Sequence, residues 1–221
     1  MTKPLSKIYW LWIPLAAIIL QMILEFTVPR DLLSIMHSEN GPHETLQFLV
    51  MVGCFFVALF AMISKHTKNL FLRAWFGLAV LASFYVAGEE VSWGQHFWDW
   101  ATPEFWSGIN DQQETNLHNT SSWLDQKPRL ILEIGIIFGA LIYPLLKNRQ
   151  ILTLPPKLDY LMPSKLLGFI ALLVIVPQIL EKAFEAVDIS IFARFSEVQE
   201  LYMFYFVLLY LIMLHQKSKN T

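Results

Sequence analysis

Charged residues and cysteine are both scarce in this chain of 221 residues. Only 15% of the residues are Asp, Glu, Lys or Arg, whereas a soluble domain carries about 25%. Cys54 is the only cysteine, so an intrachain disulfide is excluded, and it lies within an apolar run. The first apolar run is followed by LEFTVPRD, which offers no small-x-small cleavage site. We therefore expect a retained membrane anchor rather than a signal peptide.

Long apolar runs make up most of the sequence. Hydrophobic residues account for 55% of the chain, and the mean hydropathy is +0.46. Six runs are long enough to cross about 30 Å of hydrocarbon as helices. They are residues 8–26, 45–64, 71–88, 130–146, 166–180 and 198–214. The sequence thus predicts an all-α, polytopic integral membrane protein with a single transmembrane domain over residues 1–221.

The basic residues predict the orientation of the six spans. Short loops rich in Lys and Arg stay in the cytoplasm. With the N-terminus inside, eleven of the sixteen Lys and Arg residues fall on the cytoplasmic side. This distribution predicts that both termini are cytoplasmic.

The acidic residues are distributed even more unevenly. Seventeen of the eighteen fall in outer loops or at the outer ends of spans, and only Asp159 is cytoplasmic. Acids contribute little to orientation, so insertion does not explain the bias. Solvation of the outer loops is one explanation, and we favour it for Glu185, Asp188 and Glu197. Ionised groups that adjoin apolar runs are usually paired, which predicts a polar layer beneath the outer surface. Its members are Glu25, Glu89, Glu90, Glu133, Glu181 and Glu200.

The long outer loop over residues 89–129 is the main candidate for a functional site. It holds five of the eight tryptophans, and Trp favours the headgroup level of a bilayer. We expect HFWDWATPEFW to lie along the membrane interface, with a break at Pro103. Such a segment is either a lipid-binding lip or an ordinary interfacial anchor.

The same loop carries candidate metal ligands. Glu114 and His118 are four residues apart, so on a helix they share one face. A carboxylate with an imidazole suits zinc, iron or manganese. Glu90 (or its neighbour Glu89) and His96 complete the predicted metal site. Amide side chains that would orient the ligands are Gln95, Asn110, Gln112, Asn116 and Asn119. Alternatively, Asp111 and Glu114 form a helix capping box and His118 faces water.

Other outer residues add candidates for chemistry. Glu89 and Glu90 are adjacent carboxylates, of which one suits the role of general base. Ser92 and His96 are four residues apart, the spacing of a nucleophile with its base on a helix. A further outer polar cluster comprises His37, Glu39, His43, Glu44 and Glu200.

GEEVSWGQ, followed by NDQQETNLHN and preceded by SENGPHE, resembles motifs of a family of bacterial multi-pass membrane proteins of uncharacterised function. The resemblance covers the middle third of the chain and implies a location in the bacterial plasma (inner) membrane. The chain is more loosely similar to membrane hydrolases of the alkaline-ceramidase type, which also gather His, acid and Ser groups near a bilayer surface. Those enzymes carry histidines on their spans, whereas the spans predicted here contain none.

The sequence leaves three functions open. The first is a metal-dependent membrane hydrolase acting on a lipid-like substrate at the outer face, with membrane lipid as partner. The second is a cation or proton channel or transporter with an acidic outer vestibule. The third is a scaffold or sensor that associates with itself or with a membrane protein, for which Gly135 and Gly139 form a G-x-x-x-G pattern. No phosphate-binding loop and no nucleic-acid-binding surface is evident in the sequence.

Overall fold

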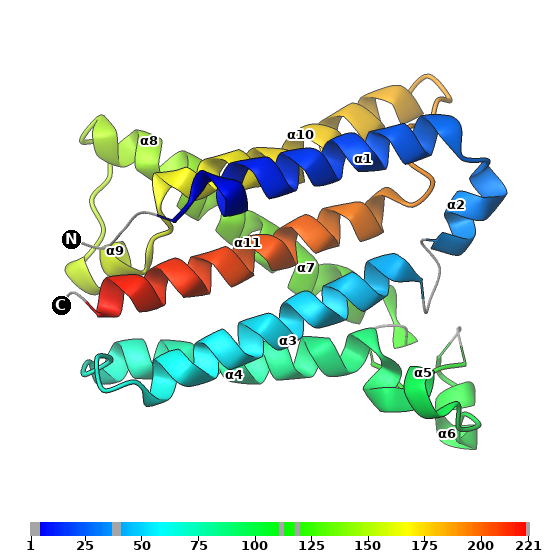
Figure 1. Cartoon of the computed structure of the whole chain (residues 1–221), viewed down its shortest axis with the longest axis horizontal. Coiled ribbons are helices and arrows are strands. Elements are labelled where there is room, and N and C mark those ends of the chain that lie inside the picture. Colours follow the sequence, from blue (N-terminus) through cyan, green and yellow to red (C-terminus); the bar gives the residue numbers. More distant parts are fainter. Residues whose placement is uncertain (1–4, 37–40, 111–112, 118–119, 220–221) are drawn as a thin grey trace.

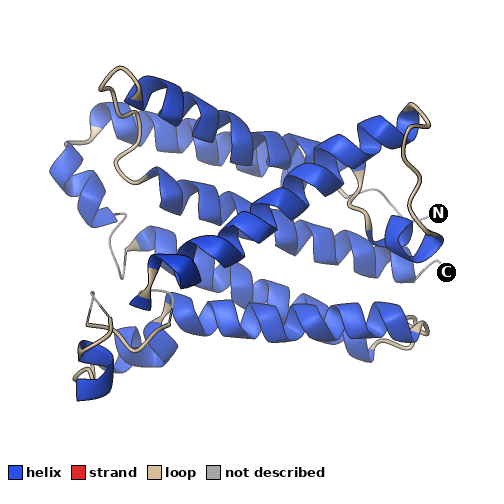
Figure 2. Ribbon diagram, turned by 180° about the vertical axis from the view of Figure 1, so that it is seen from behind, coloured by secondary structure: helices blue, strands red, loops and turns tan. Residues whose placement is uncertain are grey.

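The computed structural model describes residues 5–36, 41–110, 113–117 and 120–219. Throughout these ranges the regular secondary structure is helical and there is no strand (Figure 2). The fold is therefore all-α. Six helical segments are long and apolar enough to cross a membrane, as the sequence predicts.

The spans run back and forth through the bundle, and the fourth crosses the others obliquely (Figure 2). They cover Ile8–Thr27, Pro42–Ile63, Leu70–Glu90, Gln126–Asn148, Lys165–Glu185 and Phe195–Ser218. The first joins a π-helical turn, η1 (Ile8–Trp12), to α1 (Ile13–Thr27), and the fourth joins α7 (Ser122–Ile137), η4 (Phe138–Ile142) and α8 (Tyr143–Asn148). Because the number of spans is even, α1 begins and α11 (Phe195–Ser218) ends at the same end of the bundle (Figure 1).

Helix α11 lies at the centre of the bundle. It packs against α3 (Pro42–Ile63) on one side and α10 (Gly168–Glu185) on the other, while α4 (Leu70–Glu90) packs against α3 (Figure 1). Half of the apolar window of α11 is buried, compared with 17–33% in the other five spans. The apolar residues that remain exposed on the outer helices suit contact with lipid rather than water.

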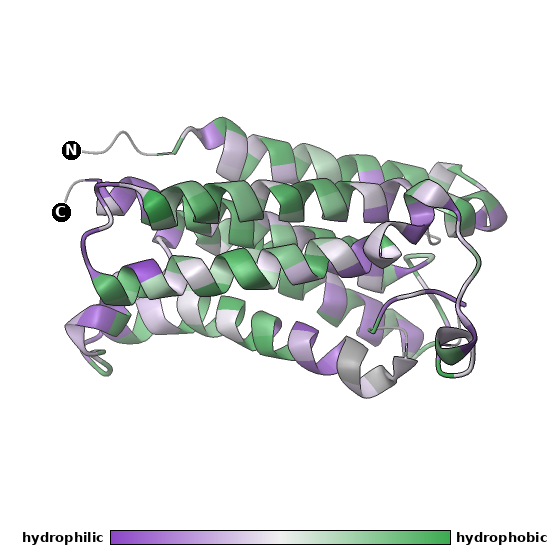
Figure 3. Ribbon diagram, turned by 90° about the horizontal axis from the view of Figure 1, so that it is seen from below, coloured by the Kyte–Doolittle hydropathy of each residue, from purple (hydrophilic) through white to green (hydrophobic). Residues whose placement is uncertain are grey.

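Two apolar cores form on opposite sides of α11. Cys54, Ala58, Phe76 and Leu211 belong to the core between α3, α4 and α11. Met203, Val174 and Ile170 belong to the core that α11 shares with α10, α7 and η4. The polar residues, purple in Figure 3, gather toward the ends of the helices, away from the two apolar cores.

Several spans extend beyond the ranges predicted from hydropathy, and α7 and α10 are two of them. Helix α7 begins at Ser122 rather than at residue 130, and α10 continues to Glu185 rather than stopping at residue 180. Both extensions are polar segments, so they are helical without being apolar. A hydropathy window detects the part of a helix that suits hydrocarbon and misses the polar turns beyond it.

We call the end of the bundle where α4 ends and α11 begins the acidic end. It carries the short helices α2 (Arg30–Met36), η2 (Ser92–Gly94), α5 (Gln95–Trp98) and α6 (Glu104–Ser107). The opposite end carries α9 (Pro156–Leu161) and η5 (Lys165–Leu167) (Figure 1). There Asp159 accepts hydrogen bonds from Tyr143 Oη (2.5 Å) and from Lys147 Nζ.

Two buried carboxylates anchor the loop between α10 and α11 at the acidic end. Glu181 accepts hydrogen bonds from the Ser190 hydroxyl (2.9 Å) and from the backbone amides of Ile191 (3.1 Å) and Phe192 (3.2 Å). Glu25 on α1 accepts one from the amide of Ala193 at 3.1 Å. Glu25 and Glu181, both predicted members of the polar layer, therefore stabilise the fold, because they accept hydrogen bonds from backbone donors of a loop that is partly buried.

Candidate functional site

The site begins at an unusual turn that ends α4. Ser92, Trp93 and Gly94 all have left-handed backbone conformations, with φ of 46°, 56° and 106°. A Cβ at Gly94 would lie 2.5 Å from the Trp98 ring, and one at Gly88 would lie 2.8 Å from the Trp93 ring. The glycines of the GEEVSWG run thus allow the chain to turn back and its indole to pack on α4.

Glu89 fastens this turn to the distant segment 113–117. Its Oε1 accepts a hydrogen bond from Trp93 Nε1 and its Oε2 one from the backbone amide of Leu117, both at 2.7 Å. Only 3% of Glu89 is exposed. A buried carboxylate with two such donors is bound in place by charge-assisted hydrogen bonds. Its contacts support a role in shaping the loop.

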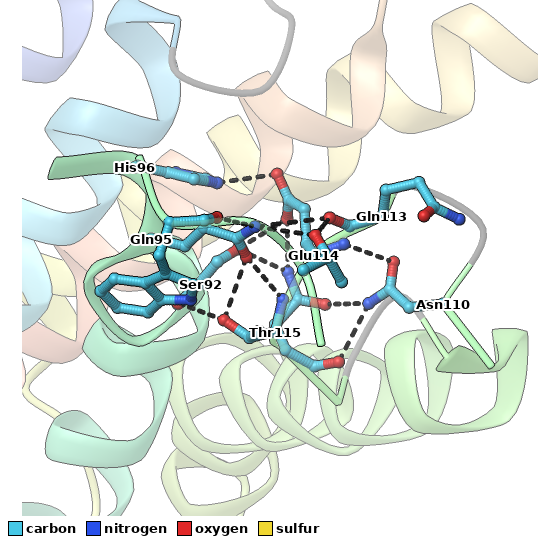
Figure 4. Close-up of polar contacts among 10 residues, drawn as sticks. Ser92, Gln95, His96, Asn110, Gln113, Glu114 and Thr115 are labelled. Atoms are coloured by element: carbon cyan, nitrogen blue, oxygen red, sulfur yellow. Dashed lines mark hydrogen bonds and ion pairs between the residues drawn. The ribbon is translucent and has the colours of Figure 1, made fainter. Parts of the chain in front are cut away.

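Glu114 lies at the centre of the polar network in Figure 4. Its Oε2 accepts from the Ser92 hydroxyl and from Asn116 Nδ2, both at 2.6 Å. Asn116 Nδ2 also donates to Ser92 Oγ at 2.9 Å. Ser92 and Asn116 have no solvent exposure. Glu114 therefore acts as an acceptor, as an ionised carboxylate does.

The orientation of each amide in this network is determined by its neighbours. The amide of Glu114 donates to Asn110 Oδ1 at 3.3 Å, so Asn110 Nδ2 is left to donate to Asn116 Oδ1 at 2.9 Å. Asn116 must then direct its Nδ2 toward Glu114 and Ser92. The hydrogen bonds run in one direction and converge on the Glu114 carboxylate.

The other oxygen of Glu114 contacts His96. The distance between Glu114 Oε1 and His96 Nε2 is 2.7 Å, and the two side chains are only 9% and 10% exposed (Figure 4). Since an ionised carboxylate only accepts, His96 donates through Nε2, and in the neutral imidazole the lone pair is then on Nδ1. The pair is a carboxylate-oriented imidazole, an arrangement used by general bases and by metal-ligating histidines alike.

Gln95 joins the two halves of the loop. Its Oε1 accepts from the Thr115 amide at 2.8 Å and from the Thr115 hydroxyl at 3.0 Å, and its Nε2 donates to Thr102 Oγ1 at 2.9 Å. The Thr115 hydroxyl also donates to the carbonyl of Ser92 at 2.9 Å. These contacts hold α5, and with it His96, against segment 113–117.

His96 and Glu114 line a cavity of about 680 Å³ at the acidic end, which we call the acidic cavity. Its walls come from α3, α4, α7, α11 and segment 113–117. Seven carboxylates and three cationic side chains line it among the described residues. The carboxylates are Glu44, Glu89, Glu90, Glu114, Glu133, Glu197 and Glu200, and the cations are Lys127, Arg129 and Arg194. The surplus of negative charge favours a cationic occupant.

Glu90 differs from Glu89 although the two are adjacent. Successive residues of a helix point about 100° apart. Glu90 lines the acidic cavity, whereas Glu89 accepts a hydrogen bond from the backbone amide of Leu117 in the loop. Glu90 interacts electrostatically with Glu44, Glu197 and Glu200 but forms no hydrogen bond or ion pair with the described part of the chain. Its position is consistent with a side chain that meets a ligand.

The predicted site residues fall into three groups. Glu89, Glu90, Gln95, His96, Asn110, Glu114 and Asn116 lie together, as does Ser92, and Glu44 and Glu200 line the same cavity. His43 is buried at the start of α3 and does not line the cavity. His37, Glu39, Gln112, His118 and Asn119 lie outside the described residues.

Two geometric assumptions of the sequence analysis were wrong. Residues 113–117 are not helical, so neither the i,i+4 pairing of Glu114 with His118 nor the capping box applies. Glu197 lines the acidic cavity instead of facing bulk water, whereas Glu185 and Asp188 are exposed as expected. In the Ser92–His96 pair, the Ser92 hydroxyl donates to Glu114 and the side chain is fully buried, which supports a positioning role.

Several residues of the site carried no sequence signal that we used. Arg129 and Arg194 line the acidic cavity, and Arg129 Nη1 pairs with Glu200 Oε1 at 2.9 Å. Thr115 and Thr102 complete the hydrogen bonds of Gln95. Glu133, which adjoins an apolar run and was predicted to belong to the polar layer, lines the cavity as well. In the sequence, Arg129 and Arg194 bear only on the predicted orientation of the spans.

The described side chains do not form a ready-made metal site. No three His, Cys, Asp or Glu residues within the described ranges are grouped so that they could hold one ion. Both oxygens of Glu114 are already in hydrogen bonds, which favours an orienting role over coordination. His96 and Glu90 are the donors that best fit a metal, and His118 lies outside the described residues. Zinc, iron or manganese binding therefore stays a prediction.

The protein is thus a multi-pass membrane protein that has a polar cavity at one end of its helices. No protein-family model, curated protein or solved structure matches the chain. The geometry of the site is consequently the basis for proposing what the protein does.

Proposed function

We propose that the protein is a membrane-embedded hydrolase that acts on a lipid-like substrate in the acidic cavity. The observation that carries the proposal is the 2.7 Å contact between His96 Nε2 and Glu114 Oε1 at the cavity wall. A histidine oriented by a carboxylate is the group most often used for proton transfer near neutral pH. The rest of the polar network holds this pair in place.

The arrangement supports general-base hydrolysis. His96 Nδ1 takes a proton from water as the water oxygen forms a bond to the carbonyl carbon or phosphorus of an ester. Glu114 stabilises the resulting imidazolium through the Nε2–H bond, as the carboxylate of a catalytic triad does. The imidazolium then returns the proton to the leaving alkoxide as the ester bond breaks. Ser92 and Asn116 keep Glu114 in the acceptor orientation that this sequence of steps requires.

A divalent cation fits the proposal without being required by it. A metal held by His96 and Glu90 would lower the pKa of its bound water toward neutrality and so supply hydroxide. Glu114 would then orient the ligating imidazole, as carboxylates do behind many metal-bound histidines. Elemental analysis of the purified protein tests whether such a metal is bound.

The location of the site favours a lipid as substrate. The cavity lies at the ends of membrane-spanning helices, and Trp98, two residues after the cavity-lining His96, is 73% exposed. Aromatic residues at span ends favour the headgroup level of a bilayer. We place the acidic end on the extracytoplasmic face of a bacterial plasma membrane, since the opposite end carries most of the Lys and Arg residues.

Transport through the bundle is less well supported. Beneath the acidic cavity, the space between α3, α4 and α11 is filled by an apolar core that includes Cys54, Phe76 and Leu211. A conducting path needs polar groups or water along its length. A cavity closed below by packed apolar side chains suits a reaction chamber better.

Turnover of defined lipids in nanodiscs tests the proposal. The substrates are phosphatidylethanolamine, phosphatidylglycerol, cardiolipin and an N-acyl sphingoid base, each incubated with and without a chelator. Mass spectrometry follows the release of fatty acid or headgroup. The wild-type protein is expected to hydrolyse at least one of them, and His96→Ala and Glu114→Gln to lose at least about 100-fold in rate.

The matched control is Glu104→Gln, which removes an exposed carboxylate in the same loop and is expected to leave turnover unchanged. Intact folding of each variant is checked by size-exclusion chromatography. Absence of turnover for every lipid, or equal rates for the wild type and His96→Ala, would contradict the proposal.

A further inference from the structure

Glu90 and Glu133 are the unsatisfied carboxylates of the acidic cavity. Both line it, on α4 and α7, and neither forms a hydrogen bond or ion pair with the described residues. Carboxylates beside apolar segments are expensive unless they are paired. By contrast, Glu200 is paired with Arg129 and Glu89 with Trp93 and Leu117. The described residues therefore supply no counter-charge to Glu90 or Glu133.

The carboxylates of the acidic cavity can also hold a cation larger than a bare metal ion. A divalent ion needs oxygen ligands at about 2.0–2.6 Å, yet no three acidic or histidine side chains of the described ranges are close enough to share one. Glu90 nevertheless interacts electrostatically with Glu44, Glu197 and Glu200. An alkylammonium group can be surrounded by carboxylates at this wider spacing, and the ring of Tyr85 in the same wall can add a cation–π contact.

The cavity also contains a complementary cationic part. Lys127 and Arg194 line it together with the carboxylates. Arginine and lysine side chains bind phosphate through charge-assisted hydrogen bonds. A ligand that carries both an ammonium group and a phosphodiester would therefore satisfy both parts of the wall. The volume of about 680 Å³ lies within the usual range for a small-molecule site.

From these contacts we infer that the acidic cavity binds the headgroup of an amino-phospholipid, with the ammonium group at Glu90 and Glu133 and the phosphate at Lys127 and Arg194. The spans that form the walls would keep the acyl chains in the bilayer. The inference deepens the proposed function, because it names the class of substrate. The binding itself does not depend on hydrolysis and can be measured separately.

Native mass spectrometry of the full chain in detergent micelles tests this inference. Dioleoyl phosphatidylethanolamine and dioleoyl phosphatidylglycerol are titrated in parallel, since they share acyl chains and phosphate and only the former carries an ammonium group. The wild-type protein is expected to bind the ethanolamine lipid at least 10-fold more tightly. In Glu90→Gln/Glu133→Gln this preference is expected to fall below about 3-fold, a loss of roughly 0.7 kcal/mol or more in discrimination.

Glu104→Gln is the matched control and is expected to keep the full preference. Equal binding of the two lipids by the wild type, or an unchanged preference in the double variant, would overturn the inference. So would stoichiometric Zn²⁺ or Mn²⁺ that remains bound in the wild type and is lost in Glu90→Gln. Lipid preference without turnover would retain the binding inference and reject the hydrolase. Lipid turnover without a preference for the ethanolamine lipid would retain the hydrolase and reject the binding inference.

Discussion

Two sets of carboxylates at the acidic end are used in different ways. Glu25 and Glu181 accept hydrogen bonds from the loop between α10 and α11, and both are at most 7% exposed. Glu90 and Glu133 line the acidic cavity without such donors in the described structure. Placement near the end of a span is therefore not enough to identify a functional carboxylate. What distinguishes the sets is whether the fold supplies partners.

The largest expected effect on stability concerns the first set. Glu181→Ala removes the acceptor of the Ser190 hydroxyl and of the amides of Ile191 and Phe192. Leaving one buried and two partly buried donors unsatisfied is expected to lower the free energy of unfolding by about 3 kcal/mol. Equilibrium unfolding by sodium dodecyl sulfate in mixed micelles measures the change. Glu185→Ala, on the exposed last turn of α10, is the control, and an equal loss in both variants would show that Glu181 does not anchor the loop.

A smaller effect is expected for Ser92, and it separates two roles. If Ser92 positions Glu114, Ser92→Ala should lower turnover by about 10- to 100-fold, as loss of an orienting partner commonly does. If Ser92 were the nucleophile, the loss would be on the order of 10⁴-fold or more. The measurement is the rate of lipid turnover in nanodiscs. A loss of the larger size would assign the covalent step to Ser92 and reject the positioning role.

The smallest effect is expected at the opposite end, where the partners of a carboxylate are exposed. Hydrogen bonds from Lys147 and Tyr143 hold the pKa of Asp159 below its usual range. A carboxylate with a lowered pKa in the folded state stabilises above its unfolded pKa and loses that contribution as the pH falls through the folded value. Asp159→Asn should thus be slightly less stable than the wild type at neutral pH and equal to it once the pH has fallen below the folded pKa of Asp159. Thermal unfolding across this pH range provides the check, and a difference that persists at low pH would contradict the assignment.

The architecture was largely predictable from the sequence because the bilayer imposes a simple requirement. Helices must be apolar over about 20 residues, and six such helices are present. Their polar ends were missed at Ser122 and Glu185 because these turns are helical without being apolar. The packing of α11 at the centre was not predictable, since hydropathy alone does not say which spans are neighbours.

The composition of the site was more predictable than its geometry. The paired glutamates, Gln95, His96, Asn110, Glu114 and Asn116 stood out as polar residues beside apolar runs, and they do lie together. Their directions depend on three consecutive left-handed residues at the end of α4, which residue spacing cannot reveal. Arg194 and Glu197 reach the cavity from another helix end, so only the packed bundle brings them into it.

Glu90 and Glu133 are, on this proposal, the two carboxylates of the acidic cavity that serve a ligand and not the fold. The most direct measurement compares the free energies of unfolding of Glu90→Gln and Glu181→Gln in detergent without added lipid. Glu90→Gln is expected to lose no stability, and to gain up to about 1 kcal/mol, because the substitution removes the cost of burying a carboxylate and its repulsion by neighbouring carboxylates. A clear loss is expected for Glu181→Gln. An equal loss in the two variants would contradict the claim.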